Sequence, residues 1–149
     1  MWRERLIMWR ELVSRLFDDA RFRSPATAHE LQEVESALGL TLPADLRSLL
    51  LESNGVAADY SAPLVWSAAE MIEQNLLFRR NPDFRDLYMP FDALFFFGAE
   101  GNGDQFAYRI LDGQIRESSI YEWNHESDNR QWFAHDLKDY FARSVPGHQ

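Results

Sequence analysis

The fold is decided by one stretch of the chain, Leu94-Phe95-Phe96-Phe97-Gly98-Ala99-Glu100-Gly101-Asn102-Gly103-Asp104-Gln105-Phe106-Ala107-Tyr108-Arg109-Ile110. Aromatic and β-branched runs on either side of a glycine-rich turn are typical of consecutive antiparallel strands. In the second run, large apolar residues alternate with polar or small ones, which is the period of a half-buried strand. The first run is apolar on both faces, and it therefore predicts a central strand with cover above and below.

The turn between the two runs is rich in glycine but does not match a phosphate-binding loop. It lacks the Lys-Ser/Thr pair of such loops, and it leads into a strand instead of a helix N-terminus. We therefore interpret residues 98–103 as a hairpin turn, in which Asn102-Gly103 supplies the positive-φ positions.

The chain on both sides of this hairpin predicts an α+β fold. Further apolar runs end at Trp123 and Ala134, so we expect a mainly antiparallel sheet of about four to six strands within residues 64–134. Two capping boxes, Thr27-Ala28-His29-Glu30 and Ser67-Ala68-Ala69-Glu70, predict helix starts before the sheet. Residues 136–143 have the pattern of one C-terminal helix. The sheet is thus expected to be covered by N-terminal helices and by this last helix.

Residues 1–23 have the pattern of an amphipathic helix. Trp2, Leu6, Trp9, Val13 and Leu16 share one helical face. A membrane-surface helix would look similar, but the anionic character of the remaining chain favours a face that packs on the protein. We therefore expect residues 1–149 to form a single domain, and no apolar run approaches the ~18 residues of a membrane span.

Charge is distributed unevenly along the chain, whose formal net charge is −9. Residues 1–25 hold six arginines and four acids, a net charge of +2, which leaves nine bases and 20 acids, a net charge of −11, for residues 26–149. This balance argues against nucleic-acid binding, because a protein needs a basic surface to bind phosphates. It favours a basic protein as the partner. The alternative is that the acidic surface only confers solubility. The absence of cysteine and of a secretory signal pattern predicts a cytoplasmic protein.

The polar cluster His125-Glu126-Ser127-Asp128 is the strongest candidate for chemistry. Together with Asp104 it could hold a metal, although no second histidine follows four residues on. The alternative is a structural loop in which Arg130 bridges Asp128 or Asp104. Neither a Gly-x-Ser-x-Gly elbow nor a cysteine is present for nucleophilic catalysis. We expect the structural role, with Asp104 bonded to Arg130, and we expect no metal and no cofactor.

Three blocks of sequence follow one another in a characteristic order. The first block is Glu30-Leu31, Val34-Glu35, Leu38-Gly39-Leu40, Leu42-Pro43, Asp45-Leu46-Arg47, Leu49-Leu50 and Asn54-Gly55. The second is Gly101-Asn102-Gly103-Asp104 with Gln105-Phe106, and the third is Trp123, His125, Glu126, Asp128 and Arg130. Together these blocks resemble the SUKH superfamily, the Smi/Knr-type proteins of bacteria and fungi, over residues 24–145.

This resemblance implies an α+β domain without catalytic activity. Many bacterial members look like immunity proteins, which bind and neutralise a cognate toxin that is often a nuclease, whereas fungal members regulate cell-wall synthesis. We therefore expect a non-enzymatic immunity protein with a basic toxin domain as its partner. The alternatives are a metal-dependent hydrolase that uses Asp104, His125, Glu126 and Asp128, and a regulatory or scaffold module without a toxin partner.

Two sets of residues follow from this interpretation. Loop positions are the expected place for binding anchors, because helices and strands are committed to the core. The candidate partner-binding residues are Asp59, Tyr60, Glu100, Glu122, Glu126 and Asp128. The motif residues expected to be structural are Gly39, Pro43, Asn54, Gly55, Gly103, Asp104, Trp123, His125 and Arg130.

Overall fold

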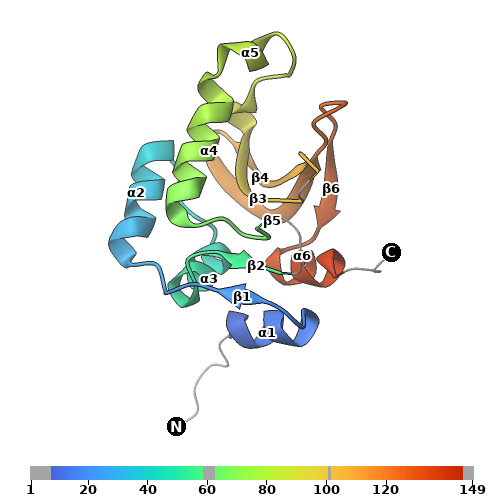
Figure 1. The fold of residues 1–149 in the computed structure, drawn as a ribbon. Helices are drawn as coiled ribbons and strands as arrows, with labels where there is room; N and C mark the ends of the chain where they lie inside the picture. The colour runs from blue at the N-terminus through green and yellow to red at the C-terminus, as the bar shows by residue number, and fades with distance from the viewer. Residues whose placement is uncertain (1–7, 59–62, 101, 146–149) are drawn as a thin grey trace.

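The computed structural model describes residues 8–58, 63–100 and 102–145. Figure 1 shows the elements along the chain. In chain order they are α1 (Trp9–Leu16), β1 (Arg21–Phe22), α2 (Ala28–Leu38), α3 (Ala44–Glu52), β2 (Val56–Ala57), α4 (Ala68–Arg80), α5 (Pro82–Arg85), the 3-10 helix η1 (Phe91–Ala93), β3 (Leu94–Ala99), β4 (Gln105–Leu111), β5 (Gln114–Trp123), β6 (Arg130–Ala134) and α6 (Leu137–Ser144).

The predicted α+β class is confirmed. The main sheet has four antiparallel strands in the order β3-β4-β5-β6, so each strand pairs with its neighbour in the chain, and β1 pairs with β2 in a separate small sheet. Both predicted capping boxes are present, at Thr27 before α2 and at Ser67 before α4. The predicted last strand and C-terminal helix are β6 and α6.

The prediction that Phe95-Phe96-Phe97 forms a central strand is wrong, because β3 lies at one edge of the sheet. The strand is buried on both faces as expected, but other parts of the chain, instead of a second strand, cover its outer edge. The side chain of Asn75 in α4 accepts a hydrogen bond from Phe96 N and donates one to Phe96 O, both at 2.8 Å. Beyond it, Trp66 N donates to Phe97 O at 2.7 Å, and Ala99 N donates to Pro63 O at 3.1 Å.

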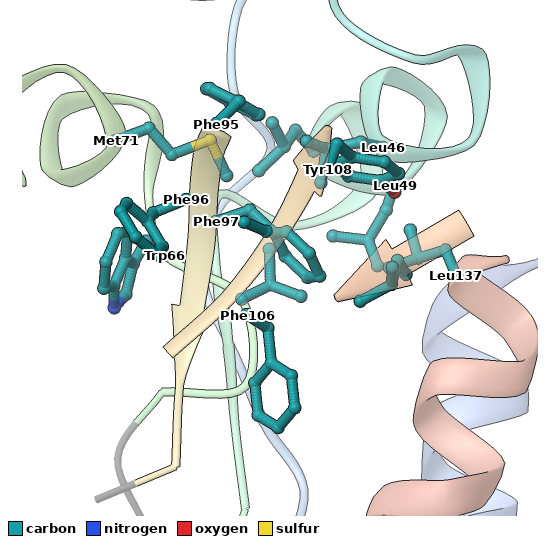
Figure 2. Close-up of a cluster of buried hydrophobic side chains, with 14 of the residues drawn as sticks. Leu46, Leu49, Trp66, Met71, Phe95, Phe96, Phe97, Phe106, Tyr108 and Leu137 are labelled. Atoms are coloured by element: carbon teal, nitrogen blue, oxygen red, sulfur yellow. The ribbon is translucent and has the colours of Figure 1, made fainter. Parts of the chain in front are cut away.

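The two faces of the sheet are packed by different elements. On one face, Phe78 of α4 and Phe91 of η1 contact the rings of Phe96 and Trp123. On the other face, Tyr140 of α6 contacts Phe97 and Phe106, and leucines of α3 lie beside the ring of Tyr108 (Figure 2). The core therefore lies on both sides of β3 and β4.

The N-terminal helix packs on the protein as predicted for the part that the structure describes. In α1, Trp9 and Val13 are buried, and the Trp9 indole donates to Ser48 Oγ of α3 at 2.7 Å. Trp2 and Leu6, which were predicted to extend this face, lie outside the described residues. No helix in residues 8–58, 63–100 and 102–145 is long and apolar enough to cross a membrane.

Candidate functional site

The candidate site lies at the end of the sheet where the β3–β4 turn meets the connection from β5 to β6. Gln105 at the start of β4 pairs with Trp123 at the end of β5, and Trp123 pairs with Arg130 at the start of β6. This register brings Asp104, just before β4, next to His125, just after β5. The second and third sequence blocks therefore meet in space.

Asp104 holds these two loops together. Its Oδ1 atom accepts a hydrogen bond from His125 N at 3.0 Å and lies 2.8 Å from His125 Nδ1. The histidine ring leaves no room for a side chain at Gly103, where an added Cβ would lie 2.9 Å from the ring. Gly103 also has a positive φ of 103°, which favours glycine. Burial alone would raise the pKa of the Asp104 carboxyl, but the hydrogen bonds and charge of His125 and the Asn102 amide hold it below its usual value.

Replacing Asp104 by alanine is expected to lower the free energy of unfolding by about 1–3 kcal/mol, because the hydrogen bonds that join the two loops are lost. Chemical denaturation measures this effect, with D86A at an exposed position of the chain as the control. A pKa that is lowered by folding stabilises the native state above the pKa of the unfolded chain, and this contribution is lost as the pH falls through the folded value. The difference between wild type and D104A should therefore shrink in acid.

Arg130 does not bond to Asp104, so that part of the prediction is wrong. Its guanidinium group instead donates to Asp128 Oδ1 at 3.0 Å and to the carbonyl oxygens of Met89 at 2.8 Å and Pro90 at 3.0 Å. Asp128 also accepts from the Trp123 indole at 2.8 Å and from Met89 N at 2.9 Å. The positive φ of Asp128, 62°, turns the backbone so that Asp128 and Arg130 reach the same partners. This network pins the chain before η1 to the β5–β6 connection.

Three carboxylates crowd together beside this network. One oxygen each of Glu100, Asp104 and Glu122 lies within 4.8 Å of the others, and we call these three residues the acidic lip. Burial, a hydrogen bond with Glu100 and repulsion from Glu100 and Asp104 raise the pKa of Glu122 to about 8. Oxygen ligands of this kind are what Ca²⁺ or Mg²⁺ prefers, so these are the residues that could hold a hard cation.

The raised pKa of Glu122 predicts a particular pH dependence of stability. Folded Glu122 keeps a proton that the unfolded chain releases above its ordinary pKa of 4.5. The stabilisation that is present below this pKa is therefore lost as the pH rises towards about 8. The melting temperature should fall over this window in the wild type and stay flatter in E122Q, which should be the more stable protein at the alkaline end. Thermal unfolding across this pH range, with E73Q on the exposed face of α4 as control, tests the prediction. Parallel profiles for wild type and E122Q would contradict it.

The structure separates the other residues predicted for the site. Glu126 is exposed, and its backbone N–H donates to Asn124 Oδ1 at 2.8 Å. Of the four residues considered for a hydrolase, the acidic lip contains just Asp104, while Asp128 is engaged by Arg130 and Trp123. The candidate partner-binding residues Asp59 and Tyr60 lie outside the described residues.

The remaining motif residues shape the backbone around the core. Gly39 ends α2 with a positive φ of 69°, Pro43 is the residue before α3, and Gly55 has a φ of 113°. The side chain of Asn54 accepts from Ala68 N at 2.8 Å, which ties the end of α3 to the start of α4.

A family model described as SMI1-KNR4 cell-wall (SUKH_6) matches residues 28–141, from the start of α2 into α6. The chain belongs to the SUKH family. The matched range contains all three sequence blocks and the whole four-stranded sheet, so the SUKH motifs coincide with the loops that Asp104, His125 and Arg130 hold together. A search of curated proteins found no match.

One part of this site has no signal in the sequence. Glu100 and Glu122 were predicted as separate binding positions, and nothing in the local sequence indicates that their carboxyl groups lie together. The contact depends on the pairing of Phe106 with Glu122 across β4 and β5, a long-range register that local patterns do not determine.

Proposed function

We propose that this SUKH-family chain is a non-enzymatic binding domain of the immunity type, which binds a basic toxin domain in the cytoplasm and neutralises it. The observation that carries the proposal is the acidic lip, in which the carboxyl groups of Glu100, Asp104 and Glu122 lie together at one end of the sheet. Membership in the SUKH family agrees with a protein-interaction role.

The acidic lip favours a cationic partner on energetic grounds. Carboxylates held this close repel one another, and this repulsion adds to burial and to the hydrogen bond with Glu100 in raising the pKa of Glu122. A lysine or arginine of a partner would relieve this repulsion and allow Glu122 to ionise, so part of the binding free energy would come from strain that the free protein already holds. Binding would then release a proton near neutral pH.

A nuclease toxin fits this surface because it must present lysine and arginine to its phosphate substrate. A protein with a net charge of −11 over residues 26–149 can occupy the same basic surface, and the charge speeds the encounter. Affinity beyond this attraction requires a few buried contacts at the centre of the interface.

The test is to express a toxin-type protein whose gene neighbours that of this chain, together with the wild-type chain and with two variants that each exchange two glutamates for glutamine. E100Q/E122Q replaces two carboxyl groups of the acidic lip, and the control E33Q/E73Q replaces two at exposed positions on α2 and α4. We expect wild type and the control to protect the cells and the lip variant to bind at least about tenfold more weakly, a loss of about 1.4 kcal/mol. Failure of the wild type to protect would refute the immunity role. Equal binding by both variants would keep immunity but move the interface away from the acidic lip.

A further inference from the structure

A cavity lies towards the opposite end of β4 from the acidic lip. It occupies about 320 Å³ between the first turns of α3 and α6 and the beginning of β5. This volume is at the lower end of the range for ligand pockets. Its walls include Pro43, Asp45, Ile115, Ser118 and Leu137, and Tyr108 of β4 also lines it. We call this cavity the Tyr108 pocket.

The hydroxyl group of Tyr108 has no hydrogen-bond partner among the described residues, although the side chain is only 1 % exposed. The ring itself is firmly placed, because it contacts Phe95 and Phe97 and lies beside Leu46 and Leu49 of α3 (Figure 2). A buried polar group without a partner costs free energy that a ligand could recover. The pKa of this phenol is raised far above its usual value by burial, Asp45 and Asp136, so the group stays a neutral hydroxyl.

Two carboxylates, those of Asp45 and Asp136, are near enough to this hydroxyl to raise its pKa, and Asp45 also lines the pocket. Asp136 caps α6, where its Oδ1 accepts from Asp139 N at 2.8 Å. Asp45 lies in the first turn of α3, and within residues 8–58, 63–100 and 102–145 its carboxylate has no hydrogen bond or ion pair. Burial and the neighbouring charge of Asp136 raise the pKa of Asp45. Arg116 also lines the pocket, but its Nε donates to Leu111 O at 2.9 Å. Its charge is not one of the causes that shift the pKa of Asp45.

We propose that the Tyr108 pocket receives an arginine or lysine side chain of the protein partner. The cationic group would donate to the free carboxylate of Asp45 and to the phenolic oxygen of Tyr108, while its aliphatic stem lies on Ile115 and Leu137. An anion would bind less well, because the carboxylates of Asp45 and Asp136 would repel it. The identity of the partner rests on the proposed function, but the chemistry of the pocket does not.

A small probe tests the pocket without any toxin. N-acetyl-L-arginine amide is titrated into the isotopically labelled full chain, and the neutral citrulline analogue serves as the matched control. We expect saturable chemical-shift changes at Ile115 and Leu137, with a Kd on the order of 1 mM for a ligand of this size. The citrulline analogue should cause none of these changes.

Variants separate the pocket from general acidity. D45N should weaken arginine binding about tenfold, which corresponds to the loss of one charged contact, whereas E33Q on α2 should leave it unchanged. Y108F should weaken binding too, while its melting temperature stays equal or rises, because no internal hydrogen bond is lost. A lower melting temperature of Y108F with unchanged arginine binding would refute the proposal, as would equal shifts with arginine and citrulline, or shifts confined to the acidic lip. Toxin neutralisation is measured in a separate experiment. If the pocket does not bind arginine, the immunity role is not refuted, and if the chain does not neutralise the toxin, the result on arginine binding is not affected.

Discussion

Replacing Asn75 by leucine is expected to lower the free energy of unfolding by about 2–4 kcal/mol. Asn75 is 1 % exposed, and its amide makes three hydrogen bonds, to Met71 O and to both backbone groups of Phe96. A leucine has the same branched side-chain shape but leaves the N–H and C=O of Phe96 buried without partners. Such unsatisfied groups cost more than a neutral hydrogen bond contributes, because their full desolvation penalty remains. Chemical denaturation at neutral pH measures the difference.

E73A is the matched control for this variant, since Glu73 is exposed on the same helix and its replacement removes none of these bonds. Amide hydrogen exchange adds a local readout, in which Phe96 N–H should lose its protection in N75L first. If N75L unfolds at the same denaturant concentration as wild type, the hydrogen bonds of Asn75 do not stabilise the edge of β3.

Replacing Gly98 by alanine is expected to cost about 3 kcal/mol or more, because there is no space for one extra methyl group. An added Cβ would overlap Leu64 O and lie 2.9 Å from Leu64 C, and both atoms belong to the backbone, which can yield only by moving the covering segment. The hydroxyl of Tyr140, which would lie 3.2 Å from the same Cβ, donates to Leu64 O. The methyl group would therefore separate β3 from residues 63–66 and weaken the contact with α6 as well.

G113A provides the comparison, since Gly113 has a positive φ of 77° but open space around an added Cβ. Its expected cost is about 1 kcal/mol, from backbone strain alone. Thermal unfolding should rank the proteins as wild type, G113A and then G98A. A melting temperature of G98A above that of G113A would show that residues 63–66 shift at little cost to accommodate the methyl group.

The parts of the fold that were predictable from sequence depend on local chemistry. A capping box is recognisable because its two hydrogen bonds join residues three apart, and Thr27 and Ser67 both mark helix starts correctly. The alternation of Gln105 to Ile110 identified Phe106, Tyr108 and Ile110 as buried side chains of β4, although Ala107 on the opposite face is buried as well.

The unpredicted parts depend on contacts between distant segments. Burial on both faces looks the same whether a strand is flanked by two strands or by one strand and a helix, so the place of β3 in the sheet was not determined by its composition. The partner of Asp104 is His125 instead of Arg130, because Arg130 pairs with Trp123 across β5 and β6 and its guanidinium group donates to Asp128 in the connection between them. The missing partner of Tyr108 shows only when α3 and α6 are in place. One local signal was available for Asn75, a polar residue on the apolar face of its helix.

The covered edge of β3 also governs how the protein behaves among copies of itself. Leu94–Ala99 is an uncharged, aromatic segment of six residues, the kind that stacks into fibrils when its backbone is free. Its bonds to Asn75, Pro63 and Trp66 occupy the groups that a strand from another molecule would need. Detachment of α4 together with residues 63–66 would therefore promote aggregation at high expression levels, because it would expose the edge of β3 to strands of neighbouring molecules.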